Sequence, residues 1–303
     1  MNDSREPLEI AGSVAVVTGG ASGIGKGIVR ALLERDATVV VADIEAPQIE
    51  ATVTEMSALD GVGADQISGI QADVSDFDSM DSLAASVFDQ HDRCNLLFNN
   101  AGVGSGGGGK AWESEPNDWK WCFGVNVFGT ANGVGAFVPR MIESGQPGHV
   151  TNTSSGDGGF APVPMASVYA SSKAAVSCFT EALNHQLRSE TDQLSASVFY
   201  PSGGMMDTGL FNAARNRPEH LQRVRNPSRR SAMTFEQLKE LVAKSGREVK
   251  VADLDELGHY VVDAVSERRY IIARDIEDTV DLLHRRADAI GAFDMPPVHE
   301  MGI

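Results

Sequence analysis

The chain has 303 residues, of which 42% are hydrophobic and 22% charged, a composition typical of a globular protein with ample apolar material for a core. Its formal net charge of −17 argues against nucleic acid as a partner, because no general basic field is available to displace counterions from phosphates. No apolar stretch reaches the length of a signal peptide or a membrane span, and the three cysteines match no zinc pattern, so we expect a cytoplasmic protein without a metal or membrane partner.

Short apolar strands alternate with helices over the first two thirds of the chain. Runs rich in β-branched residues predict buried strands at 13–20, 37–43, 66–74, 94–102, 148–155 and 194–201. Apolar residues at helical spacing predict helices at 23–36, 46–59, 79–91, 117–144 and 168–188. Continuous rather than alternating apolar strands indicate a parallel sheet covered on both faces, so we expect an α/β fold of the Rossmann-like, doubly wound type.

The alternating pattern breaks between 202 and 251, a polar stretch, called the insert below, that carries Arg215, Arg217, Arg223, Arg225, Arg229 and Arg230. A helix at 253–265, a last strand at 268–273 and a closing helix at 278–290 follow, which makes about seven strands. We find no internal repeat and no linker between two cores. The sequence therefore predicts a single domain (1–303), in which the insert is a substrate-binding lid and 275–303 is a C-terminal extension.

The turn after the first strand reads TGGASGIG. Glycine lets the backbone approach a pyrophosphate closely, and the free N–H groups at the start of the next helix attract the phosphates. A strand before and a helix after are the context in which such a turn binds a dinucleotide, and no Gly-Lys-Ser/Thr sequence of a triphosphate-binding loop follows. The cofactor contacts expected from this turn are Thr18, Gly19, Ser22, Gly23, Ile24 and Gly25.

Asp43 ends the second predicted strand, 18 residues beyond Gly25. A carboxylate at this position accepts hydrogen bonds from the adenosine ribose hydroxyls and repels a 2′-phosphate. No arginine or lysine follows it directly, so the sequence favours NAD over NADP as the cofactor, with Ile44 as a neighbouring contact. An exposed acid at a strand end, without a ligand, is the alternative interpretation.

Five motifs stand in order along the chain: the turn from Thr18 to Gly25, NNAG at 99–102, Asn126 in GVNVFG, Ser155 in NTSS, and Tyr169-x-x-x-Lys173. Each is weak evidence alone. Together, at these separations, they make the chain similar to the short-chain dehydrogenase/reductase family over about residues 11–210, and only loosely similar beyond. This resemblance implies an NAD-dependent oxidoreductase with Asn126, Ser155, Tyr169 and Lys173 as its catalytic residues. Ser154 remains an alternative to Ser155.

The same resemblance implies further cofactor contacts along the strand ends. It places Asp73 and Val74 beside the adenine, and Tyr169 and Lys173 beside the nicotinamide ribose. The remaining contacts that it implies are Asn100, Ala101, Gly102, Pro201, Gly203 and Thr208. The stretch YPSGGMMDTG departs from the usual family pattern, so the register of the contacts at Pro201, Gly203 and Thr208 stays open.

Tyr169 and Lys173 share one face of a helix, because they are four residues apart. Free tyrosine, with a pKa near about 10, is a poor base at neutral pH. We expect the ammonium of Lys173, together with the positive nicotinamide, to lower the pKa of Tyr169 and make it the general acid or base. Ser155 is expected to donate a hydrogen bond to the substrate oxygen.

Apolar residues in two segments indicate a hydrophobic, adaptable substrate pocket, with ordinary packing under a loop as the alternative: Phe160, Met165, Met205 and Met206. The stretch 137–150 and the C-terminal extension resemble bacterial dehydrogenases of aryl or other bulky secondary alcohols. The leading prediction is therefore hydride transfer between NAD(H) and a bulky hydrophobic secondary alcohol or its ketone.

Two other functions stay open at this point. The arginines of the insert are suited to an anionic or acyl-thioester substrate, unless they are solvated or paired with acidic side chains. The third hypothesis is a non-catalytic NAD-sensing or scaffold protein. Such a protein has no need of proton-transfer groups such as Tyr169 and Lys173. The resemblance also implies a homodimer or homotetramer formed through the helices at about 117–144 and 168–188.

Overall fold

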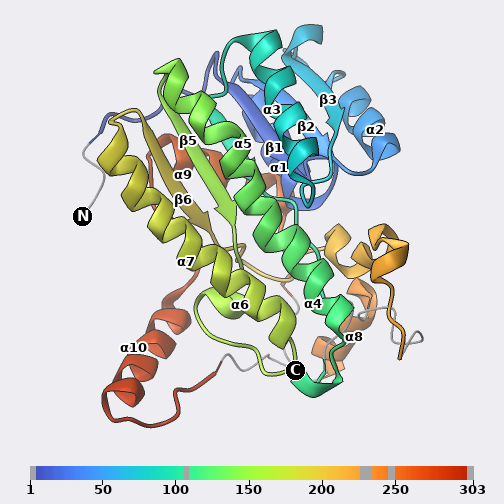
Figure 1. Cartoon of the computed structure of the whole chain (residues 1–303), viewed down its shortest axis with the longest axis vertical. Helices are drawn as coiled ribbons and strands as arrows, with labels where there is room; N and C mark the ends of the chain where they lie inside the picture. The colour runs from blue at the N-terminus through green and yellow to red at the C-terminus, as the bar shows by residue number, and fades with distance from the viewer. Residues whose placement is uncertain (1–4, 106–108, 226–233, 245–249, 299–303) are drawn as a thin grey trace.

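Seven parallel strands form one sheet in the computed structural model, which describes residues 5–105, 109–225, 234–244 and 250–298 (Figure 1). The strand order is β3-β2-β1-β4-β5-β6-β7. The central strand β1 pairs on both sides, with Val16 opposite Val40 of β2 and Leu97 of β4. The strand bounds are β1 (Val14–Thr18), β2 (Thr38–Asp43), β3 (Ile67–Gln71), β4 (Leu96–Asn99), β5 (Gly148–Thr153), β6 (Leu194–Phe199) and β7 (Ile271–Ile272). The predicted doubly wound α/β fold is confirmed.

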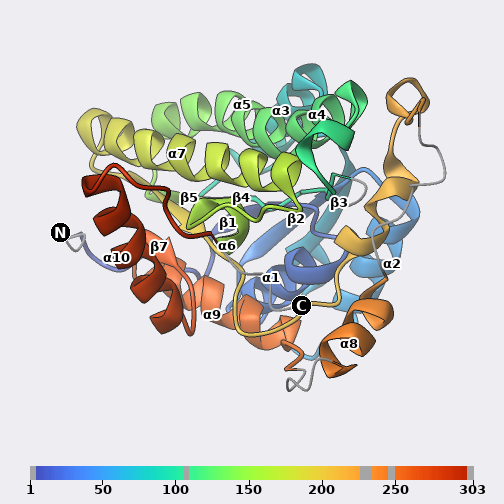
Figure 2. The ribbon, with the colours of Figure 1, turned by 90° about the horizontal axis from the view of Figure 1, so that it is seen from below.

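Helices cover both faces of the sheet (Figure 2). Side chains alternate along β1, so that Ala15 and Val17 enter one core while Val14 and Val16 enter the other. The first core lies under α1 (Gly23–Leu33), α2 (Ala46–Met56) and α9 (Leu254–Ser266). The second lies under α3 (Phe77–His91), α5 (Gly129–Ser144) and α7 (Ser167–Glu190). The two-sided burial explains why the strands read as continuous apolar runs.

The ends of several helices are fixed by local capping. The side chain of Asp76 accepts a hydrogen bond from the Asp78 N–H at the start of α3 (3.1 Å). Asp253 accepts from two N–H groups at the start of α9 (2.9 and 3.0 Å). Helix α5 ends at Gly145, whose φ of 63° is the left-handed conformation that glycine adopts readily. These caps fix where α3 and α9 begin and where α5 ends.

The predicted helix at 117–144 is interrupted by a wider turn. It consists of α4 (Pro116–Phe123), a π-helical segment, η3 (Gly124–Phe128), and α5. The last strand is shorter than predicted. Helices that we did not predict are α6 (Gly156–Gly159), α8 (Phe235–Lys244), and the 3₁₀ segments η1 (Ala64–Gln66), η2 (Ala111–Glu113), η4 (Gly209–Asn216) and η5 (Glu219–Leu221).

The insert leaves and rejoins the fold at one place, because Met205 and Val251 form a β-bridge. The Met205 N–H donates to the Lys250 carbonyl, and the Ala252 N–H donates to the Met205 carbonyl, both at 2.8 Å. Helix α10 (Glu277–Gly291) extends from the body beneath α7 (Figures 1 and 2). None of the helices within the described ranges is long and apolar enough to cross a membrane.

Candidate active site

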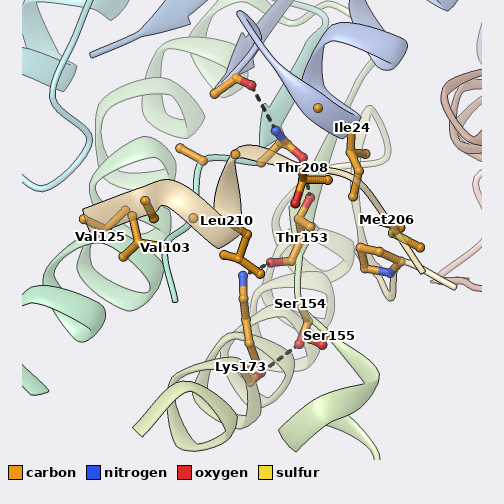
Figure 3. Close-up of a pocket in the computed structure, with 18 of the residues that line it drawn as sticks. Ile24, Val103, Val125, Thr153, Ser154, Ser155, Lys173, Met206, Thr208 and Leu210 are labelled. Carbon is orange, nitrogen blue, oxygen red and sulfur yellow. Dashed lines mark hydrogen bonds between the residues drawn. The ribbon is translucent and has the colours of Figure 1, made fainter. Parts of the chain in front are cut away.

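A cavity of about 530 Å³ opens at the carboxyl ends of the strands. Its lining comes from the segments that follow β1 to β6, from α4, η3 and α7, from the insert and from residues 275–279 at the start of α10. Figure 3 shows part of this lining, with Lys173 pointing from α7 toward Thr153, and with Met206, Thr208 and Leu210 contributed by the insert. In open α/β sheets this edge is where ligands bind.

The glycine-rich turn after β1 is held close to the end of β4. The Thr18 hydroxyl donates to the Phe98 carbonyl (3.2 Å) and accepts from the Asn100 and Ala101 N–H groups (3.0 and 3.2 Å). A Cβ on Gly25 would lie 2.2 Å from the Gly19 carbonyl oxygen, so only glycine fits there. This close approach leaves the turn as bare backbone against the cavity.

Asp43 is oriented by backbone N–H groups at the end of β2. Its two carboxylate oxygens accept from the Ala21 N–H and the Glu45 N–H, each at 3.2 Å. Burial raises the pKa of Asp43, and these N–H groups act in the opposite direction. A carboxylate placed here, between the glycine-rich turn and the Asp73 loop, is suited to binding the hydroxyls of a ribose.

Asn126 lies in the π-helical segment and ties three parts of the site together. Its side-chain oxygen accepts from the Val103 N–H (2.8 Å), and its amide donates to the Val103 carbonyl (3.0 Å) and the Ser172 hydroxyl (2.9 Å). Its backbone carbonyl accepts from the Thr130 hydroxyl (2.8 Å). A Cβ on Gly102 would lie 3.4 Å from both Asn126 Oδ1 and Lys173 Nζ, so the NNAG loop passes directly beside both groups.

Lys173 is buried, and its ammonium group donates to the Thr153 carbonyl at 2.9 Å. Burial lowers the pKa of Lys173 to about 8. Its Nζ lies 5.8 Å from the centre of the Tyr169 ring. Both side chains come from one face of α7, as their spacing predicts.

The protein's own groups raise the pKa of Tyr169. The predicted lowering also counted the positive charge of a bound nicotinamide, so it stays a prediction. Burial raises the pKa of the phenol above its ordinary value, and a hydrogen bond with Ser155 only partly opposes that effect. The negative charge of Asp157 raises it further. Desolvation of the phenolate therefore outweighs the hydrogen bond with Ser155.

Ser155, rather than Ser154, is hydrogen-bonded to the phenol. The Ser154 hydroxyl donates to the Lys173 carbonyl (2.8 Å) and lies 2.7 Å from the Ser177 hydroxyl, so it is committed to α7. Ser155 bonds with Tyr169 and accepts from the Asp157 N–H (3.2 Å). The geometry therefore favours Ser155 over its neighbour as the group that meets a substrate oxygen.

The structure brings most of the predicted site residues into this one cavity. The lining includes Gly19, Ser22, Gly23, Ile24, Asp43, Ile44, Asp73, Val74, Asn100, Ala101, Gly102, Ser155, Phe160, Tyr169, Lys173, Pro201, Met206 and Thr208. Thr18, Gly25 and Asn126 lie outside the lining, although the first and third hold lining segments in place.

Three further residues predicted to contact cofactor or substrate lie outside the lining: Met165, Gly203 and Met205. Gly203 does not line the cavity, whereas its neighbours Ser202 and Gly204 do. Met205 is taken up by the β-bridge that closes the insert, and Met165 lies 44% exposed in the loop before α7. Gly203 and Met205 are each one residue from a lining residue, whereas Met165 is four residues from Tyr169.

Several lining residues were not predicted. Asp157 and Tyr200 follow β5 and β6, and Glu45 follows Asp43 by two residues. Asp275 and Ile276, just before α10, and Thr279 in its first turn also line the cavity. Glu45, an acid two residues beyond Asp43, could have been recognised in the sequence. No local pattern indicates that 275–279 returns to the cavity.

Three arginines of the insert pair with acidic side chains. Arg215 forms an ion pair with Glu45. Arg217 and Arg223 both bond to the buried Asp118 of α4, at 2.9 and 2.5 Å. The N–H of Arg225 donates to the carboxylate of Glu115. These contacts favour the interpretation that the arginines of the insert pair with acidic side chains. Arg229 and Arg230 lie outside the described residues.

The residues present fit a dinucleotide better than a metal ion. Bare glycine backbone, the carboxylate of Asp43 and the cation of Lys173 line one continuous cavity, which are the groups that pyrophosphate and two riboses require. Within the described part of the chain, no group of three or more His, Cys, Asp or Glu side chains is arranged to hold a metal ion.

Comparison with known proteins places the chain in a family. The family model described as short chain dehydrogenase matches residues 13–219. The C alpha-dehydrogenase of Sphingobium sp. is 37% identical over 208 residues, which cover 68% of this chain and 64% of that relative. The chain thus spans less than two thirds of the length of that curated relative.

Solved structures extend the similarity to nearly the whole chain. A short chain dehydrogenase/reductase from Burkholderia phymatum, in complex with NAD, is 32% identical with a TM-score of 0.83 and covers 96% of this chain and 98% of its own. A metagenomic short-chain oxidoreductase in complex with NADP is also 32% identical, with a TM-score of 0.58 over 65% of this chain and 85% of its own. The chain therefore belongs to the short-chain dehydrogenase/reductase family of oxidoreductases, which bind a nucleotide cofactor.

Proposed function

We propose that this chain is an NAD-dependent dehydrogenase that interconverts a bulky, hydrophobic secondary alcohol and its ketone. The observation that carries the proposal is the presence of Ser155, Tyr169 and Lys173 in the cavity that also contains Asp43 and the glycine-rich turn. A proton-transfer group and a dinucleotide site in one space are the two requirements for oxidising a carbinol.

The choice of NAD rests on Asp43. Its carboxylate is suited to the two ribose hydroxyls and would repel a 2′-phosphate. The Burkholderia relative, which covers almost the whole chain, was solved with NAD, whereas the relative solved with NADP matches a smaller part. Both the local chemistry and the more extensive similarity support NAD.

The proton steps fall to Tyr169 and Ser155. Tyr169 supplies a proton to the oxygen of a ketone, or removes it from the hydroxyl of a carbinol, while Ser155 donates a hydrogen bond to the same oxygen. A bound nicotinamide supplies or accepts the hydride and, when oxidised, adds a positive charge. Because burial raises the pKa of Tyr169, that charge and the ammonium of Lys173 are needed for the phenol to act as a base.

The walls of the substrate end favour a neutral, apolar substrate. The rings of Phe160 and Tyr200 pack with their centres 4.1 Å apart, and Met206 and Ile276 add apolar surface. Asp157 also lines this end and would repel a substrate carboxylate. The three paired arginines of the insert are engaged with Glu45 and Asp118, which weighs against an anionic substrate tail.

The test is reduction of NAD⁺ by a panel of aryl carbinols, other bulky secondary alcohols and hydroxyacyl thioesters, followed with the Tyr169→Phe variant. We expect turnover of the neutral carbinols, and a loss of about a thousandfold in kcat on removing the phenol oxygen, with NADH binding retained. Tyr260→Phe is the matched control, because its hydroxyl donates to the Ala273 carbonyl away from the cavity. Undiminished turnover by Tyr169→Phe would refute the assignment.

We also propose that the chain forms a homodimer or homotetramer through the α4–α5 and α7 helices. Phe128 at the start of α5 and Ile142 within it are 60% and 37% exposed, which leaves apolar surface for a second copy. Light scattering of the purified protein tests this directly. A monomer at micromolar concentration would contradict it.

A further inference from the structure

We propose that Glu45 and Arg215 form a second pair that selects the cofactor, beyond Asp43. In this inference Glu45 neutralises the guanidinium of Arg215 beside the adenosine end of the cavity. The guanidinium is then not available to bind the 2′-phosphate of NADP. The inference rests on the proposed function, because it concerns the same dinucleotide site. It differs from the Asp43 argument, since it depends on a contact between the end of β2 and the insert.

The contact between the two segments is well defined. The Glu45 carboxylate accepts from Arg215 Nη2, from Arg215 Nε at 3.2 Å and from Asn216 Nδ2 at 2.9 Å. The Glu45 side chain is 24% exposed and that of Arg215 33% exposed, so water only partly screens the pair. The hydrogen bond from Arg215 lowers the pKa of Glu45 and keeps the carboxylate ionised at neutral pH.

The insert itself fixes where the guanidinium lies. Arg215 Nη1 donates to the carbonyls of Gly209 and Asn212, at 3.3 and 2.9 Å. A Cβ on Gly209 would lie 3.5 Å from both Arg215 Nη2 and the Ser22 hydroxyl. The guanidinium therefore lies beside the phosphate-binding turn as well as beside Glu45, and Arg215, Asn216 and Glu45 all line the cavity.

Charge decides what this arrangement accepts. A phosphate on the ribose 2′-oxygen adds close to two negative charges next to Asp43 and Glu45. A guanidinium is the side chain best suited to bind a phosphate with two parallel hydrogen bonds, but Glu45 already occupies that fork. Among the described lining residues, Arg215 is the cation at this end, since Lys173 lies at the other. Removing the Glu45 charge should therefore release Arg215 for phosphate.

The experiment titrates NADH and NADPH against the full chain without substrate, using nicotinamide fluorescence. Glu45→Gln should bind NADPH about tenfold more tightly than wild type, while the NADH affinity changes less than about threefold. Adding Arg215→Met to Glu45→Gln should remove most of the NADPH gain, because the gain needs the cation. Glu50→Gln, an exposed acid of α2 outside the cavity, is the control for loss of one negative charge.

Arg215→Met alone tests the pair from the other side. It leaves Glu45 without its cation, so NADPH binding should weaken by several fold relative to NADH. The inference is overturned if Glu45→Gln leaves NADPH binding unchanged, if the gain persists in the double variant, or if Arg215→Met improves NADPH binding. A wild-type chain that binds neither dinucleotide would instead refute the proposed function, so the two failures are distinguishable.

Discussion

The two sides of the cavity are held in place by different physical means. On the strand side, backbone segments touch one another directly, as at Gly25 and Gly19, and the residues involved follow strand ends. On the insert side, buried charges hold the segments together, with Asp118 bonded to Arg217 and Arg223. The strand side thus depends on local sequence, whereas the insert side depends on residues far apart in the chain.

The difference shows in what each side tolerates. A close backbone contact at a glycine is lost when the glycine is replaced, because any larger side chain overlaps the neighbouring segment. Buried ion pairs fail when one partner is lost, because the other charge is left uncompensated in a poorly solvated place. Three substitutions probe this contrast, and their expected effects decrease in the order given.

Asp118→Asn should detach the insert. Asp118 is 1% exposed, and its carboxylate accepts from Arg217, from Arg223 and from the Glu115 N–H. Burial favours its neutral form, but the hydrogen bonds from Arg223, the Glu115 N–H and Arg217 together outweigh burial and leave the pKa of Asp118 below its ordinary value. Removing this charge should cost about 4 kcal/mol of local stability.

Limited trypsin digestion measures that loss, because the insert is rich in arginine. Cleavage within 202–251 should accelerate by about three orders of magnitude if it follows the local opening equilibrium. Asp81→Asn is the control, since Asp81 pairs with Arg140 at a partly exposed site where a pair contributes less than about 1 kcal/mol. Equal cleavage rates for Asp118→Asn and wild type would show that the insert is held by other contacts.

Lys173→Met should change how stability depends on pH. The pKa of Lys173 is about 8 in the folded chain against an ordinary 10.5. Between these values the unfolded chain binds the extra proton, so wild type should gain stability with rising pH relative to the variant, by about 3 kcal/mol in total. Below pH 8 the difference between the two should stay constant. Urea unfolding at several pH values measures the difference in unfolding free energy between wild type and variant. If this difference did not change from pH 8 to 10.5, the lowered pKa of Lys173 would be contradicted.

Gly25→Ala tests the strand side. The added Cβ would lie 2.2 Å from the Gly19 carbonyl and 2.6 Å from Asn100 Nδ2, so the turn must move. We expect NADH binding to weaken by about 2 kcal/mol, or roughly thirtyfold. Gly291→Ala, with no heavy atom within 4 Å of the new Cβ, is the matched control. NADH affinity within threefold of wild type would mean that the turn is not part of the cofactor site.

The same contrast explains what could be predicted from the sequence. The glycine-rich turn, Asp43 and the Tyr169–Lys173 pair were identifiable because each motif is short and its neighbours in sequence are its neighbours in space. The partners of Asp118 lie 99 and 105 residues away, and no local pattern links them. The burial that raises the pKa of Tyr169 could not be predicted either, because spacing reveals the nearby lysine but not the extent of burial.

The π-helical segment at 124–128 has a consequence for evolution by insertion and deletion. A π-turn holds one residue more than the α-helix around it. Deleting a single residue there would restore regular α-helix and rotate α4 by about 100° against α5. Asp118 would then swing away from Arg217 and Arg223 while Asn126 lost its register with Val103. A one-codon loss would thus disturb, in a single event, both the anchoring of the insert and the hydrogen bonds that hold Val103 beside the cavity.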